Sequence, residues 1–115
     1  MLNVKPTIYN ALKTDTVLAL LATGGIFADK NPDGGTYPAI TYSEISNVPA
    51  LSADNAEDIS RVTIQVSVMT DSGSTSAIAE RVNVIMLGLG FCRQFAGDIV
   101  DGDIKIKVLR YTIAG

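Results

Sequence analysis

Three acidic side chains stand close together near the end of the chain. Asp98 is followed by Asp101 and Asp103, which flank Gly102. Grouped carboxylates could hold a hard cation or act as an acid–base pair. Aspartate is also common in exposed turns because it favours turn geometry, and nothing in the sequence supplies a pocket around these residues. We therefore interpret them as turn residues and expect no metal site.

Nucleophilic chemistry has few candidate residues. The chain contains one cysteine, Cys92, and no histidine. It therefore lacks the commonest general base near neutral pH, which is also the usual partner of a single cysteine in zinc sites and nucleophile–base pairs. Cys92 lies inside a strand pattern, and we interpret it as a buried structural residue with no internal disulfide partner. We expect neither an enzyme nor a cofactor.

Three glycine- or serine-containing segments resemble binding motifs only in part. Residues 29–34 match the first half of a calcium loop, but Ile40 stands where the final glutamate ligand belongs. Residues 88–90 match the start of a dinucleotide fingerprint, with Arg93 at the third glycine position. The serines of residues 72–76 could hold an anion at a helix start, but ordinary helix capping explains the same residues and is the interpretation that we favour. We interpret the three segments as a turn, a helix end and a cap.

The elements that would position these residues follow from hydrophobic spacing. We expect a helix at 6–13 continued by a bent or short second helix, a loop at 28–37, a strand at 38–48 with a bulge, a polar loop at 49–58, a strand at 61–68, a helix at about 74–89, and strands at 91–100 and 103–113. Asp101-Gly102 predicts a type I′ hairpin turn between the last two. The fold class is then α+β, an antiparallel sheet of about four strands with helices packed on one face, in the order α-β-β-α-β-β.

The clearest apolar faces belong to one strand and one helix. Val62, Ile64, Val66 and Val68 alternate with polar residues, and the helix places Ile78, Val82, Ile85 and Met86 on one stripe. We expect these two sets to face each other. The last strand is apolar on both faces, more than a one-sided sheet requires, so part of it would be covered by another subunit.

The polar loop at 49–58 has few apolar side chains to offset the entropy of ordering it. We therefore expect it to be mobile in the isolated chain and ordered on assembly. Leu51 would be buried by a neighbour, while Asp54, Glu57 or Asp58 would pair with its cations. With Asp101 and Asp103 of the hairpin, these are the expected interaction residues.

Length, charge and composition limit the number of domains and the kinds of partner that we expect. The chain has 115 residues, 47% of them hydrophobic, and a net charge of −3. This length suits a single domain spanning residues 1–115. Cationic residues are spread out, so we expect no nucleic-acid recognition. The longest apolar stretch, residues 17–22, is too short to cross a membrane, and no secretory signal is expected, so synthesis would be cytoplasmic.

Residues 8–15, 37–42 and 61–68 together resemble the tail completion, or head-to-tail joining, proteins of long-tailed phages and prophages, a tail terminator-like family. The similar order of elements extends over nearly the whole chain. The resemblance implies a structural virion protein that closes the head-proximal end of the tail and joins it to the head connector. It also implies an oligomeric ring, usually a hexamer, whose partners are the tail tube protein and head connector proteins. The expected location is the head–tail interface of the virion, after synthesis in the host bacterial cytoplasm.

Two other functional classes remain open from the residues alone. A small-molecule-binding regulatory α+β module is compatible with this fold class, because such folds host many functions. An enzyme acting through the aspartates would need a deep pocket and a carboxylate of raised pKa.

Overall fold

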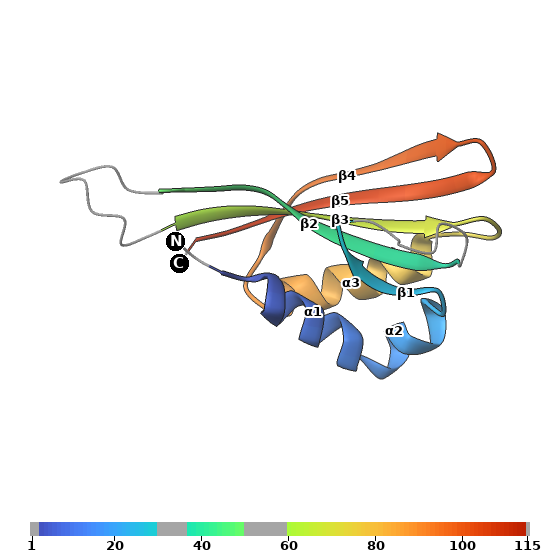
Figure 1. The fold of residues 1–115 in the computed structure, drawn as a ribbon, viewed down its shortest axis with the longest axis horizontal. Helices are drawn as coiled ribbons and strands as arrows, with labels where there is room; N and C mark the ends of the chain where they lie inside the picture. The colour runs from blue at the N-terminus through green and yellow to red at the C-terminus, as the bar shows by residue number, and fades with distance from the viewer. Residues whose placement is uncertain (1–2, 30–36, 50–59, 115) are drawn as a thin grey trace.

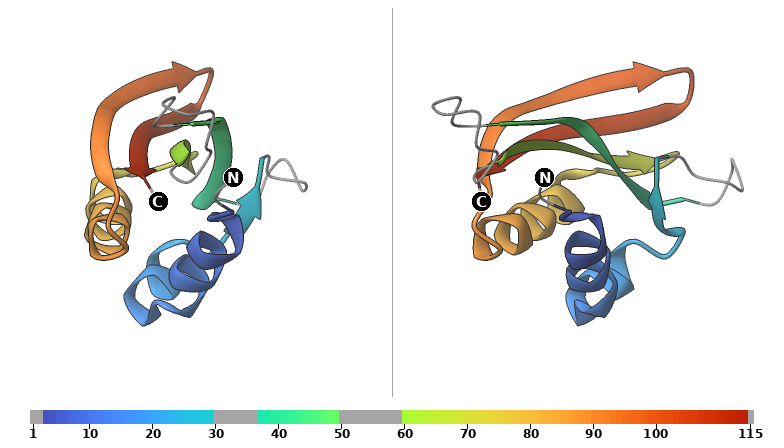
Figure 2. Two further views of the ribbon diagram at one scale, coloured as in Figure 1. Left: turned by 90° about the vertical axis from the view of Figure 1, so that its left-hand side faces the viewer. Right: turned by 60° about the vertical axis from the view of Figure 1, so that its left-hand side comes forward.

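The computed structural model describes residues 3–29, 37–49 and 60–114. In this part of the chain, three helices lie on one side of a twisted five-stranded sheet (Figures 1 and 2). The elements are α1 (Lys5–Thr14), α2 (Thr16–Leu21), β1 (Gly25–Ala28), β2 (Ala39–Pro49), β3 (Ser60–Thr70), α3 (Ser76–Gly88), β4 (Cys92–Asp101) and β5 (Ile104–Ala114). The α+β class predicted from the sequence is confirmed.

The sheet has one more strand than predicted, and it is not wholly antiparallel. Its order is β1-β2-β3-β5-β4, and β1 pairs with β2 in parallel while the other neighbours are antiparallel. The predicted order α-β-β-α-β-β is therefore wrong because it lacks β1; the short second helix that was expected after the first is present as α2. β1 has only four residues, too few to show the alternation of apolar and polar residues that indicates a strand in a sequence. Its strand conformation depends on pairing with β2, from Gly25↔Ala39 to Ala28↔Tyr42.

The turn between β4 and β5 is centred one residue later than predicted and is of a different type. Asp101 pairs with Ile104, so the two central residues are Gly102 and Asp103. Gly102 has a φ of +61°, and Asp103 does not have a positive φ. A type I′ turn needs positive φ at both central residues, whereas a type II′ turn needs it only at the first, usually glycine. The hairpin itself is confirmed, but the predicted turn type is wrong.

The predicted core is confirmed around β3 and α3. The four apolar residues predicted to face the core from β3 are fully buried, and the four predicted from α3 belong to or pack against the same cluster, although Ile85 is only half-buried. The shared cluster includes Ile8, Leu12, Ile40, Tyr42, Val62, Ile64, Val66, Val68, Ile78, Val82, Met86, Leu109 and Tyr111. The bulge predicted in the strand at 38–48 lies between Glu44 and Ser46 of β2.

Asp15 joins the two N-terminal helices to α3. Its side chain caps α2 by accepting a hydrogen bond from the Leu18 backbone N–H at 2.9 Å. The same carboxylate accepts two hydrogen bonds to Oδ2 from Arg81 of α3, at 3.0 Å from Nε and 2.6 Å from Nη2. A single side chain thus fixes both the start of α2 and its position against the long helix.

The loop predicted at 28–37 lies mostly outside the described residues, which include only 28, 29 and 37 of it. Two further sequence predictions also lie partly outside them. The first is the loop at 49–58 with Leu51, Asp54, Glu57 and Asp58, of which only Pro49 is described, as the last residue of β2. The second is the partial calcium pattern at 29–34, of which only Asp29 is described. Asp29 follows β1 with a φ of +67° and lies 3.6 Å from the Lys5 ammonium group.

Candidate functional site

The β4–β5 hairpin presents an unusually apolar free edge of the sheet. β4 pairs only with β5 and is exposed along its length, with Gly97 partly covered. Three of its large apolar side chains are solvent-accessible: Phe95 is 48%, Ile99 53% and Val100 72% exposed. Exposed edge strands of this kind are ready sites for association. The hairpin is therefore the first candidate for a contact surface.

The strand register places two of these residues on the sheet face that points away from the helices. Leu109 of β5 belongs to the helix-side core, so its neighbour Arg110 faces the other way, as does Ile106. Phe95 lies opposite Arg110 and Ile99 lies opposite Ile106. We call Phe95, Ile99 and Ile106 the sheet patch.

Arg110 and Gly97 shape the sheet patch. The Arg110 guanidinium lies 5.4 Å from the centre of the Phe95 ring and donates a hydrogen bond to Gln65 Oε1 at 3.0 Å. The ring folds over Gly97, where a Cβ would come within 2.7 Å of a ring carbon. Any larger residue at 97 would displace Phe95. A hollow of about 210 Å³ lies beside these side chains.

The hairpin-tip aspartates, Asp98, Asp101 and Asp103, do not form a chemical site. All three are exposed, and Asp98 lies 3.5 Å from the Lys107 ammonium group. Among the residues that the structure describes, no group of three His, Cys, Asp or Glu side chains is placed to hold a metal ion. Asp101 ends β4 and Asp103 lies in the turn, so both carboxylates project into solvent, where a partner could reach them.

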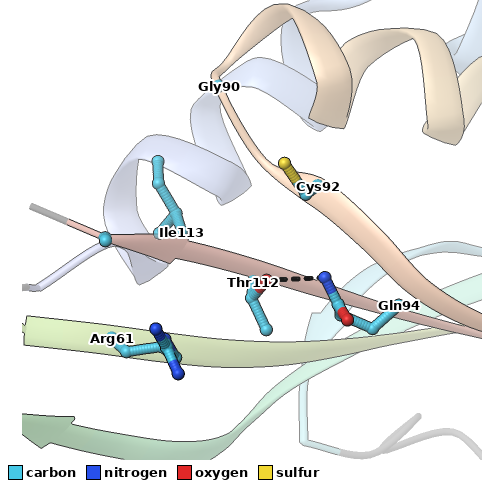
Figure 3. Close-up of a pocket in the computed structure, with 7 residues that line it drawn as sticks. Arg61, Gly90, Cys92, Gln94, Thr112 and Ile113 are labelled. Atoms are coloured by element: carbon cyan, nitrogen blue, oxygen red, sulfur yellow. Dashed lines mark hydrogen bonds between the residues drawn. The ribbon is translucent and has the colours of Figure 1, made fainter. Parts of the chain in front are cut away.

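Cys92 is exposed, so the prediction of a buried structural cysteine is wrong. The strand pattern was correct, but β4 lies at the sheet edge, where a side chain is not covered from both sides. Cys92 lines a cavity of about 490 Å³, in which Gln94 Nε2 donates a hydrogen bond to Thr112 Oγ1 at 3.1 Å. Figure 3 shows the residues that line this cavity. The other described lining residues are Arg61, Gly90, Ile113 and Ala114. None of the described lining residues is a carboxylate or an imidazole, so none of them could act as a general base for the thiol.

The most strongly shifted pKa belongs to a structural group. The Tyr111 side chain is fully buried, and its hydroxyl donates a hydrogen bond to Asn83 Oδ1 of α3 at 2.9 Å. Burial raises the pKa of Tyr111 to about 12 because the interior disfavours the charged phenolate. A group of this pKa does not exchange protons near neutral pH. It holds β5 against α3 and offers no acid–base chemistry.

The sequence interpretation had not singled out Phe95, Ile99 and Val100. Their signal was present, because apolar residues occupy both alternating positions of the segment 91–100. What the sequence could not show is that this strand is at the edge and not in the middle of the sheet, where the same residues would be buried.

Comparisons with known proteins give concordant matches. A family model described as tail completion protein gp17 matches residues 6–106. A chain from the virion of the native gene transfer agent particle is similar, with 21% identity, a TM-score of 0.67, and coverage of 94% of this chain and 92% of that one. The gp17 protein of bacteriophage SPP1 is similar with 17% identity, a TM-score of 0.57, and coverage of 96% and 88%. At these identities the two structures show a shared fold. The comparison with curated proteins gives no significant match.

Proposed function

We propose, on the premise that this chain belongs to the family of the tail completion protein gp17, that it closes the head-proximal end of a phage tail and joins it to the head connector. Family membership makes the chain a structural protein of the phage particle and not an enzyme. None of the described helices is long and apolar enough to cross a membrane. Our proposal is that the protein closes the tail, joins it to the connector and acts as an oligomeric ring.

One observation of the structure carries the assembly role: the apolar free edge formed by β4. Proteins that remain alone usually protect such an edge with lysine, proline or a short strand. β4 has ten residues, no lysine and no proline, and Asp98 is the one charged residue between Phe95 and Val100. Burial of apolar side chains gives roughly 25 cal/mol per Å², so covering this edge favours association.

The partners that we propose are further copies of the chain, the tail tube protein and the head connector proteins. Asp101 and Asp103 support this role because they are exposed at the end of the hairpin. We propose that they pair with lysine or arginine of a partner, as do Asp54, Glu57 or Asp58, while Leu51 is buried by a neighbouring subunit. Such rim charges mainly increase the rate and specificity of association. The proposed place of action is the head–tail interface, after synthesis in the host cytoplasm.

Electron microscopy of particles produced without this gene tests the proposal. Filled heads beside separate tails are expected, and a copy of the wild-type gene should restore joined particles. A Cys92→Ser copy is the matched control and should restore them equally, since the thiol has no assigned role. Joined, intact particles in the absence of the gene would refute the proposed function, as would a lack of any assembled tail.

A further inference from the structure

Helix α3 carries two large apolar side chains on the side that faces away from the sheet. Ile78, Val82 and Met86 are buried against the core, yet Val84 is 57% and Leu87 50% exposed on the other side. The solvent-facing side of a helix in a lone subunit normally carries charged or polar residues at such positions. We call Val84 and Leu87 the helix patch. It is a second uncovered apolar surface, distinct from the sheet patch.

The two patches face in opposite directions. The sheet patch lies on the sheet face that points away from the helices, while the helix patch lies on the exposed side of α3, away from the buried core residues. Figure 1 shows the helices and the sheet as two separate layers. A twofold contact uses the same patch of both copies and leaves the other patch uncovered. A contact between unlike patches covers both, and its repetition produces a ring or a filament.

The exposed charges beside the patches have opposite signs. Arg110 is exposed and lies over Phe95 in the sheet patch. Glu80 is exposed on α3, one turn before Val84, and has no hydrogen bond or ion pair with any described residue. Arg81 beside it is held by Asp15, and Arg93 and Lys107 line the same hollow as Glu80 without an ion pair to it. Lys107 instead pairs with Asp98, the acidic residue beside the sheet patch. Such an arrangement favours contact between unlike patches and opposes contact between like ones.

We propose that the helix patch of one copy docks on the sheet patch of the next, with Glu80 of one copy beside Arg110 of the other. Repetition of this contact builds the ring. The inference rests on the proposed function and adds to it the two surfaces through which the subunits meet. It commits these surfaces to a second copy of the chain; the tail tube and connector proteins would bind elsewhere.

Cross-linking in assembled particles is the direct test. In a Cys92→Ser background, one variant carries Leu87→Cys, a second carries Ile99→Cys, and a third carries both. After treatment with a short bismaleimide, the double variant should give a ladder of covalent multimers of this chain, while each single variant stays monomeric. A control that combines Leu87→Cys with Thr7→Cys, an exposed position on α1, should give no ladder.

Each contrary result has a distinct meaning. Dimers from a single variant would show a like-to-like contact and overturn the proposal. So would the absence of a ladder from the double variant, or cross-links to a tail tube or connector protein through these positions. If the gene-deletion particles are unjoined but no ladder forms, the surface assignment fails and the proposed function stands. If the deletion particles are intact, the proposed function fails, whatever the cross-links show.

A charge exchange tests the pairing of the two surfaces. Glu80→Arg places like charges across the contact, and Arg110→Glu does the same. Each variant should reduce the yield of cross-linked multimers about tenfold, a change expected when a charge pair is replaced by a repulsive one. The double exchange in one chain should restore most of the yield. Failure of the double exchange to recover more than either single variant would overturn the pairing of Glu80 with Arg110.

Discussion

Replacing Tyr111 by phenylalanine should reveal how burial of one hydroxyl makes the stability of this protein depend on pH. The ring is fully buried, and the hydroxyl donates to Asn83 at 2.9 Å. Phenylalanine fills the same space but leaves Asn83 Oδ1 without this donor. At pH 8 the loss should be about 1 kcal/mol, the typical net contribution of one hydrogen bond.

At high pH the sign of the effect changes. The folded-state pKa of Tyr111 is raised to about 12, whereas an unfolded tyrosine titrates near 10. The stabilisation is therefore complete below about pH 10 and is lost as the pH rises through 12, because the unfolded state releases the proton first. Full loss would be roughly 3 kcal/mol, and about 1.4 kcal/mol is already lost at pH 11. Phenylalanine has no such dependence, so the two proteins should become about equally stable near pH 11.

Urea unfolding followed by far-ultraviolet circular dichroism at pH 8 and pH 11 measures this difference. Tyr42→Phe is the second variant, since burial also raises the pKa of Tyr42 and the stability effect has the same sign. Comparison with wild type cancels the titration of the lysines. If wild type and Tyr111→Phe lose stability in parallel between the two pH values, Tyr111 does not keep its proton in the folded state and the reasoning is wrong.

Three further predictions concern the core, the helix junction and the hairpin tip. Met86→Ala should reduce the free energy of unfolding by about 2–5 kcal/mol, whereas Leu87→Ala, on the exposed side of the same helix, should change it by less than about 0.5 kcal/mol in urea titrations. Asp15→Ala should cost about 1 kcal/mol by removing the α2 cap, and Asp15→Asn, which keeps a cap acceptor, should cost less. Calorimetry with calcium, magnesium and manganese should show no binding tighter than about 10 µM. Tighter binding that disappears when the hairpin-tip aspartates are replaced by asparagine would show that they do form a metal site.

The sequence predicted the centre of this fold better than its margins. β3 and α3 were predictable because each has one clean apolar period, and their buried faces meet as expected. Cys92 was misjudged because a strand pattern does not reveal whether the strand lies at an edge. The turn type was predicted wrongly because Gly102 has a positive φ, which suits the second central position of a type I′ turn and the first central position of a type II′ turn. Only the pairing of Asp101 with Ile104 decides between them.

The candidate contact surfaces needed the topology as well as the residues. Val84 and Leu87 interrupt what would otherwise be a polar helix face, but the sequence alone allowed another element of the same chain to cover them. Phe95 and Ile99 join Ile106 in one patch only because β4 pairs with β5 in this register. The bulge between Arg93 and Phe95 sets the face on which Phe95 emerges, and the sequence does not specify its position.

The stability of the isolated chain gives no reason for its exposed apolar residues. At an exposed helix position, valine has a lower helix propensity than alanine, glutamate or lysine, so Val84 does not help α3 to form. Val100 is 72% exposed on an edge strand, where a charged residue would also protect the edge. The folded core around β3 uses neither side chain. Folding and association therefore depend on different residues of the same elements. In α3, Met86 stabilises the fold, whereas Leu87 takes part in association. For this reason a polar substitution in either patch should leave the subunit folded and remove only its ability to assemble.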